Sequence, residues 1–195
     1  MTSLRLVGVL TGLGVACALI LTLVAQTTAP RIAANHAAYL QKAVLQVVPG
    51  GVTQEPLEWE GVQAFEVRNA GNELQGYAVV CETRGFQDVI AFIYGYDPNR
   101  ESVTGMKVLS SRETPGLGDK IEKDAIFLEH VSNIAVPVEN DALVHQVEFV
   151  KPGQRLHEWQ VDAISGATIS SRAVVKGLSD STALWVPQLK KRRSP

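Results

Sequence analysis

Asp162-Ala163-Ile164-Ser165-Gly166-Ala167-Thr168 is the most informative stretch of this 195-residue chain for its fold and function. It places two hydroxyl side chains around a glycine, directly before a helix-like segment. The start of a helix has unpaired N–H groups and a partial positive charge, so an anion there gains hydrogen bonds and dipole attraction. Gly166 lets a ligand approach the backbone closely. The stretch predicts a turn that accepts a phosphate, although an ordinary Ser or Thr helix cap has the same spacing.

The segments before this motif are typical of neighbouring β-strands. They are rich in β-branched and aromatic residues and are separated by Gly and Asn. The expected elements are strands at Ala64–Arg68, Gly76–Cys81, Val89–Tyr96 and Ser102–Ser110, a turn at Asp97-Pro98-Asn99, a short helix at Asp119–His130, a strand at Leu143–Val150 and a closing helix from Ser170. Because the strands do not alternate regularly with helices, we expect one α+β domain with a mainly antiparallel sheet and flanking helices.

A second notable stretch, Glu113-Thr114-Pro115-Gly116-Leu117-Gly118-Asp119-Lys120, lies between the last hairpin strand and the expected short helix. Pro115 and Gly116 suit positions i+1 and i+2 of a type II turn, and Asp119 suits the N-cap of the helix that follows. The stretch is not a nucleotide P-loop, because it lacks the Gly-x-x-x-x-Gly-Lys-Ser/Thr spacing.

The N-terminus predicts a membrane anchor. No charged residue occurs from Leu6 to Ala25, and such a helix, at about 1.5 Å per residue, is roughly as long as the hydrocarbon core of a bilayer is thick. A signal peptide cleaved after Leu23-Val24-Ala25 is the alternative. The expected organisation is a cytoplasmic stub at 1–5, a transmembrane helix at 6–25, a connecting helix at 26–50, an extracytoplasmic domain at 51–187 and a basic tail at 188–195.

Composition excludes several classes of function. Cys17 lies in the expected membrane span and leaves Cys81 without a partner, so we expect no intrachain disulfide. The cysteines and the four histidines lack the spacing of iron–sulfur, haem or zinc sites. A formal net charge of −2 gives no nucleic-acid footprint.

Both motifs resemble those of a known family. Asp162 to Thr168 matches the D-x-x-[ST]-G-A-T signature of the FMN-binding domain shared by RnfG and NqrC, which belong to ion-pumping respiratory complexes, and Glu113 to Gly118 resembles the family's E-T-P-G-L-G loop. The resemblance implies that Thr168 carries FMN through a phosphoester bond made by a separate flavin transferase. It also implies that Ser165, Gly166 and Ala167 surround the phosphate, that Asp162 orders the turn or is recognised by the transferase, and that the flavin is contacted by Glu113, Thr114, Gly116, Leu117 and Gly118.

The resemblance further implies an electron-transfer subunit of an Rnf-type, ferredoxin- and NAD-linked ion-translocating oxidoreductase, with no independent catalysis by the isolated chain. Such a subunit is a single-pass protein of the bacterial inner membrane, with its N-terminus inside, its domain in the periplasm and other membrane subunits as partners. The alternatives are the equivalent protein of a sodium-pumping quinone reductase (NqrC) and the FMN-binding domain of a membrane sensor or regulator. A hydrolase that uses Ser165 or Thr168 with a histidine is disfavoured, because the Gly-x-Ser-x-Gly spacing is missing.

Overall fold

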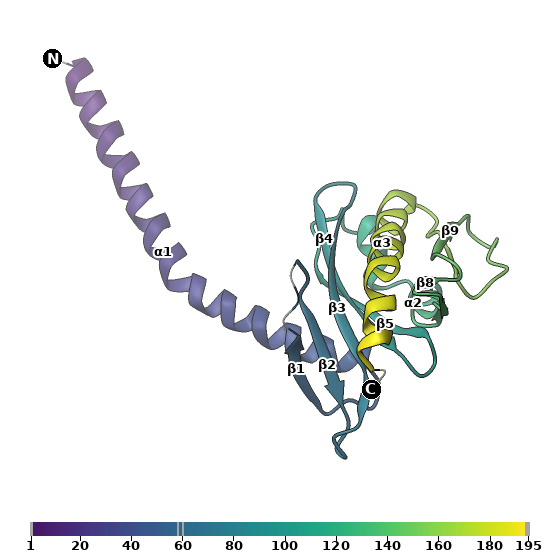
Figure 1. Ribbon diagram of the computed structural model, residues 1–195. Coiled ribbons are helices and arrows are strands. Elements are labelled where there is room, and N and C mark those ends of the chain that lie inside the picture. The colour runs from purple at the N-terminus through teal and green to yellow at the C-terminus, as the bar shows by residue number, and fades with distance from the viewer. Residues whose placement is uncertain (1, 58, 60, 194–195) are drawn as a thin grey trace. The chain divides into compact units, whose positions relative to one another are not determined.

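A computed structural model describes residues 2–57, 59 and 61–193 (Figure 1). The chain divides between Leu40 and Gln41 into an N-terminal helical unit and a compact α+β unit. Helix α1, Thr2–Val47, begins in the first unit and ends in the second.

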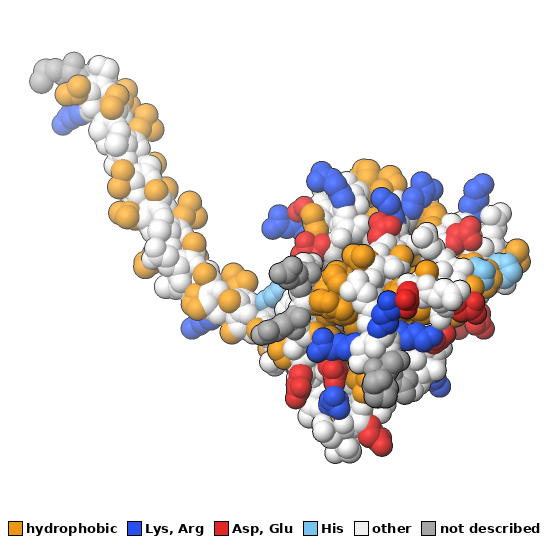
Figure 2. Space-filling view, viewed as in Figure 1, with side chains coloured by type: hydrophobic (Ala, Val, Ile, Leu, Met, Phe, Trp, Pro, Cys, Tyr) orange, Lys and Arg blue, Asp and Glu red, His pale blue; other side chains and the backbone are white. Residues whose placement is uncertain are grey.

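The helical unit has the composition of a membrane span. Among the described residues, one helix, Ser3–Val47, is long and apolar enough to cross a bilayer, and none of its most apolar window is buried in the protein. Figure 2 shows apolar side chains along its length. Apolar side chains on all sides of an unpacked helix are typical of a lipid-facing segment. The helix continues through Pro30, so the expected span at 6–25 and connecting helix at 26–50 form one continuous element.

The compact unit is built on one antiparallel sheet, as predicted. Its six strands pair in chain order: β1 (Thr53–Leu57), β2 (Ala64–Arg68), β3 (Leu74–Arg84), β4 (Val89–Asp97), β5 (Ser102–Ser110) and β6 (Ile134–Ala135). The expected strands correspond to β2 to β5, and the turn after β4 is held by the Asp97 carboxylate, which accepts hydrogen bonds from the N–H groups of Asn99 and Arg100. The outer strands β1 and β6 were not predicted from the sequence.

Helix α3, Thr168–Arg193, covers one face of this sheet (Figure 1). Gly177 brings it close to β3, since a Cβ there would lie 2.9 Å from Cβ of Thr83. The stretch expected as a basic tail continues α3 to Arg193. Leu189 is fully buried, and Lys190 forms an ion pair with Glu101.

The end of α1 lies on the other face, where glycines make room for it. A Cβ on Gly95 would lie only 2.0 Å from the carbonyl oxygen of Val47, and the Thr104 hydroxyl donates to that oxygen at 2.5 Å. Both faces of the sheet are therefore covered, and the core between the layers consists mainly of buried apolar side chains.

The region between β5 and α3 differs from the expectations. The single helix predicted at Asp119–His130 is instead a 3-10 helix, η1 (Gly118–Glu122), followed by α2 (Ala125–Val131). Asp119 is not the N-cap. Asp124 caps α2, because its carboxylate accepts from the N–H of Phe127 at 2.9 Å and so starts a new helix.

The strand predicted at Leu143–Val150 is also divided, because its two ends have different partners. Its beginning belongs to β8, which pairs with β7, and its end is β9, which runs parallel to β10 just before the Ser-Gly-Ala-Thr turn. The bounds are Val138–Glu139 for β7, Ala142–Leu143 for β8, Glu148–Val150 for β9 and Gln160–Asp162 for β10.

Candidate functional site

The Ser-Gly-Ala-Thr stretch forms a tight turn at the start of α3. The N–H of Ala167 donates to the carbonyl oxygen of Ile164 at 3.0 Å, and Gly166 has φ +80°, as position i+2 of a type II turn requires. The buried hydroxyl of Ser171 accepts from the N–H of Ile164 at 3.3 Å and donates to the carbonyl of Ala167 at 2.9 Å. Ser171 therefore holds the turn against the first turn of the helix.

Helix α3 begins at Thr168, two residues before the predicted start. In the part of the chain that the structure describes, no acceptor receives a hydrogen bond from the N–H groups of Thr168, Ile169 or Ser170. Thr168 is exposed. Unpaired N–H groups beside an exposed hydroxyl fit a phosphate group bound at this position.

The second notable stretch, residues 113–120, is called the glycine loop and forms the predicted type II turn. The N–H of Leu117 donates to the carbonyl of Thr114 at 3.1 Å, and Gly116 has φ +79°. The N–H of Gly116 is not available to a ligand, because it donates to the Asp119 carboxylate at 2.7 Å. A hydrogen bond from Lys123 lowers the pKa of Asp119, so this acceptor stays ionised at neutral pH.

Glu113 is a buried carboxylate that joins three segments. One oxygen accepts from the N–H of Gln87, in the β3–β4 loop, at 2.9 Å, and the other accepts from the Ser170 hydroxyl on α3. Gly118 makes room for it, since a Cβ there would lie 2.7 Å from Cβ of Glu113. Because both carboxylate oxygens already accept from the protein, Glu113 shapes the site by fixing these segments together.

These segments enclose a pocket of about 350 Å³, within the range of small-molecule sites. Three of its side chains, Phe86, Leu117 and Ile169, are apolar and more than half exposed, which suits a flat aromatic ring. The pocket is lined by Phe86, Glu113, Thr114, Leu117, Gly118, Gly166, Ala167, Thr168, Ile169 and Ser170. The apolar wall and the unpaired N–H groups together fit FMN, which has an aromatic ring at one end and a phosphate at the other.

The structure brings together seven of the ten predicted site residues in this pocket. Ser165 and Gly116 lie in the adjacent turns. Asp162 points elsewhere: one carboxylate oxygen accepts from the N–H groups of Gln154 and Arg155 at 3.1 and 3.0 Å, and the other lies 3.9 Å from Nδ1 of His130. Its side chain orders the loop after β9, and the turn before Thr168 is ordered by Ser171 instead.

Three residues of the pocket, Phe86, Ile169 and Ser170, were not predicted from the sequence. The sequence does contain an indication that Phe86 belongs to a binding site. It is an aromatic residue in the otherwise polar stretch Gly85-Phe86-Gln87-Asp88, and in a tight loop such a side chain has no core to pack into. Among the described residues, no histidine lines the pocket with Thr168, so the geometry does not give the hydrolase alternative the histidine partner that it requires.

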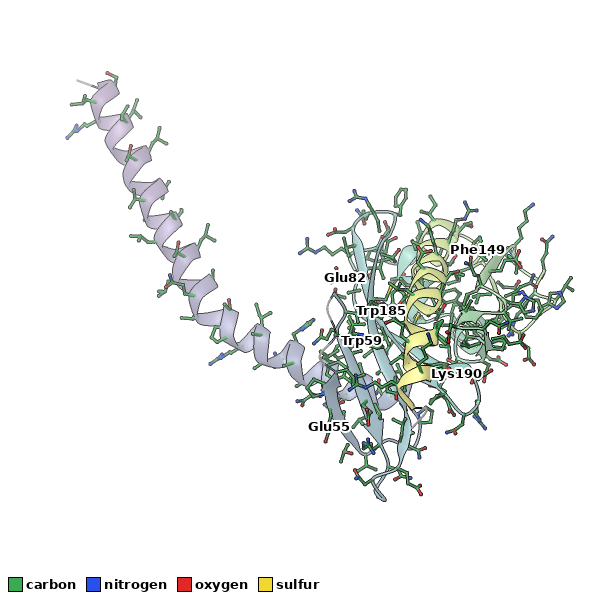
Figure 3. The ribbon with its side chains drawn as sticks, viewed as in Figure 1. Glu55, Trp59, Glu82, Phe149, Trp185 and Lys190 are labelled. Carbon is green, nitrogen blue, oxygen red and sulfur yellow. The ribbon has the colours of Figure 1, made fainter. Side chains whose placement is uncertain are left out.

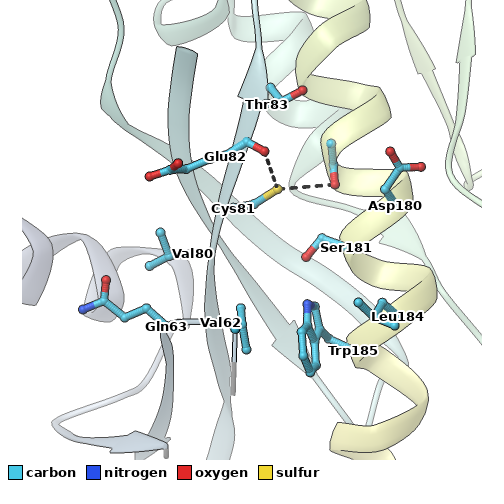
Figure 4. Close-up of a pocket in the computed structure, with 12 residues that line it drawn as sticks. Val62, Gln63, Val80, Cys81, Glu82, Thr83, Asp180, Ser181, Leu184 and Trp185 are labelled. Carbon is cyan, nitrogen blue, oxygen red and sulfur yellow. Dashed lines mark hydrogen bonds between the residues drawn. The ribbon is translucent and has the colours of Figure 1, made fainter. Parts of the chain in front are cut away.

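A second pocket, of about 500 Å³, lies between β3 and α3 and contains none of the predicted site residues (Figure 4). Trp185 lies on its wall, with its ring centroid 5.0 Å from that of Trp59 (Figure 3). The Cys81 thiol at this pocket donates to the carbonyl of Gly177 at 3.4 Å, and burial raises its pKa to about 11. The thiol is therefore protonated at neutral pH.

This pKa predicts slow alkylation of Cys81. In Cys17→Ser protein at pH 8, the folded chain should react with iodoacetamide roughly 100-fold more slowly than the urea-unfolded chain, because the pKa is raised from 9.0 to about 11. As the pH rises from about 9 to about 11, the thiol ionises in the unfolded chain while it stays protonated in the folded chain. Cys81 therefore makes the free energy of unfolding fall as the pH rises through this range. Equal labelling rates for folded and unfolded chains would contradict the buried position.

The chain belongs to the FMN-binding domain family. The family's sequence model matches residues 85–183, a region that contains both turns and every residue lining the pocket with Thr168.

The chain is also similar to individual subunits of ion-translocating oxidoreductase complexes. It is 30% identical to the G subunit of the ion-translocating oxidoreductase complex of Haemophilus influenzae (strain 86-028NP), over 92% of this chain and 88% of that protein. It is 29% identical to the G subunit of the proton-translocating ferredoxin:NAD(+) oxidoreductase complex of Clostridium ljungdahlii, over 62% of this chain and 59% of that protein. The fold resembles NqrC of the Na(+)-translocating NADH-quinone reductase from Parabacteroides distasonis, with a TM-score of 0.51, 23% identity, and coverage of 69% of this chain and 64% of that one.

Proposed function

We propose that this chain is the FMN-carrying electron-transfer subunit of an Rnf-type, ferredoxin- and NAD-linked ion-translocating oxidoreductase, with FMN attached to Thr168. The observation that carries the proposal is the position of this exposed hydroxyl. It stands on the first residue of α3, beside unpaired N–H groups and at a pocket with an apolar wall. The similarity to G subunits over most of the chain supports the assignment to a membrane complex.

Each part of the pocket has a separate role in this proposal. The first N–H groups of α3 bind the phosphate, and Gly166 leaves space for it. Leu117, Phe86 and Ile169 contact the ring and exclude water from one of its faces. Bound FMN supplies redox chemistry in one- and two-electron steps, while the protein orients the ring and sets its surroundings.

Attachment is a group transfer and needs an activated donor. A bond forms between Oγ1 of Thr168 and the flavin phosphorus, a phosphoanhydride bond of a flavin dinucleotide breaks, and a nucleotide monophosphate leaves with the hydroxyl proton. A separate flavin transferase catalyses this step, because Glu113, the one carboxylate that lines the described pocket, already accepts hydrogen bonds from Gln87 and Ser170 at its two oxygens. Thr168 is therefore a modified acceptor and does not react with the electron donor.

The proposed location of the compact unit explains why a covalent bond to FMN is useful. We propose that α1 anchors the chain in the bacterial inner membrane, with its N-terminus inside and the compact unit in the periplasm. FMN that dissociated outside the cytoplasm would be lost by dilution, whereas an ester retains it whatever the affinity. The ester also uses the phosphate end and leaves the ring free to exchange electrons.

Purification of the tagged full chain from the membranes of its own host tests this proposal. We expect covalent flavin on the chain and co-purification of membrane proteins with several spans, whose sequences identify an Rnf-type complex. Components of a quinone reductase would assign the chain to that complex instead. Flavin on a chain that purifies alone would favour a sensor or regulator.

A further inference from the structure

Lys120 reaches from the glycine loop to the turn that precedes Thr168. Its Nζ donates to the carbonyl oxygen of Ser165 at 3.3 Å and lies 3.5 Å from the position that a Cβ on Gly166 would occupy. The side chain is partly buried. An ammonium group thus lies against the one face of the turn that the glycine leaves open.

Lys120 has no ion pair with any described residue. The nearby acids are otherwise engaged, because Asp119 pairs with Lys123 at 2.6 Å and Glu113 accepts from Gln87 and Ser170. A neutral carbonyl oxygen satisfies one of the three ammonium donors and leaves the charge uncompensated. The cation is therefore able to take an anionic partner without breaking an existing ion pair.

Two sources of positive potential lie at positions a few residues apart in the turn and the helix that follows it. One is the set of unpaired N–H groups at the start of α3, and the other is the ammonium of Lys120 beside Ser165 and Gly166, just before that helix. A phosphate esterified to Thr168 keeps one negative charge, and an ammonium contributes a charge-assisted hydrogen bond to such a group. We propose that Lys120 is a positioning residue that binds the flavin phosphate and fixes it against the helix N-terminus. This inference rests on the proposed function.

Binding of FMN and riboflavin separates this role from a structural one, because the two flavins differ only in the phosphate. In full-length Thr168→Val protein, which has no attachment point, we expect FMN to bind more tightly than riboflavin. Adding Lys120→Gln should weaken FMN binding about tenfold and leave riboflavin binding unchanged, as expected for loss of one charge-assisted hydrogen bond. Lys120→Arg should keep the preference for FMN. Lys107→Gln removes the same charge at an exposed position of β5 that does not line the pocket and should change neither affinity.

A second measurement uses the covalently loaded chain and does not depend on free flavin binding. The ³¹P resonance of the attached phosphate should shift in Lys120→Gln protein and stay in place in Lys107→Gln protein. This inference would be overturned if Lys120→Gln did not weaken FMN binding in the Thr168→Val protein, or if it did not shift the ³¹P resonance of the loaded chain. Either result would leave the proposed function intact. Wild-type protein that carries no flavin and binds none would overturn both.

Discussion

Replacing Thr168 with Val abolishes covalently bound flavin when the full chain is produced together with a flavin transferase. Valine has nearly the shape of threonine and lacks the hydroxyl oxygen that the ester requires. Because Thr168 is exposed and makes no hydrogen bond through its hydroxyl to another described residue, the fold should be unchanged. In-gel flavin fluorescence under denaturing conditions measures the loss, which should be complete.

Ser165→Ala is the matched control, because it removes an exposed hydroxyl three residues earlier in the same turn. This variant should keep its covalent flavin. Fluorescence that persists in the Thr168 variant, or disappears in the Ser165 variant, would assign the attachment to another residue.

Replacing Glu113 with Ala should have the largest effect on stability among single changes in the pocket. The change leaves the N–H of Gln87 and the Ser170 hydroxyl without their acceptor and opens a cavity beside Gly118. An unsatisfied buried hydroxyl, an unsatisfied part-buried N–H and a cavity together cost about 3 kcal/mol of unfolding free energy. Equilibrium unfolding in detergent, followed by tryptophan fluorescence, measures this change.

Glu122→Ala provides the control for Glu113. Glu122 is an exposed glutamate at the end of η1, and its removal should change the unfolding free energy by less than about 0.5 kcal/mol. If the two variants are equally stable, Glu113 does not join the glycine loop to α3 through these hydrogen bonds.

The parts of the fold that local chemistry determines were predictable from the sequence. Pro115-Gly116 and Ser165-Gly166 each place a glycine where a type II turn needs positive φ, and both turns form as expected. The four central strands were equally clear, because their β-branched and aromatic residues alternate between two covered faces. These signals depend on neighbours in the sequence.

The parts that depend on distant partners were not predictable. Asp162 lies in the motif, yet its carboxylate binds the loop at Gln154 and Arg155, a choice that follows from the parallel pairing of β9 and β10. Phe86 reaches the pocket only because the β3–β4 loop is tied to Glu113 through Gln87. No spacing rule in the sequence gives either contact, because each depends on how separate segments pack.

The mass of the peptide that contains Thr168 tests the central claim most directly. The full chain is produced with and without a flavin transferase, digested, and analysed by tandem mass spectrometry. We expect a peptide heavier by one FMN less one water, with the added mass on Thr168, and only when the transferase is present. An unmodified peptide from protein made with an active transferase, or an added mass on Ser165, would contradict it.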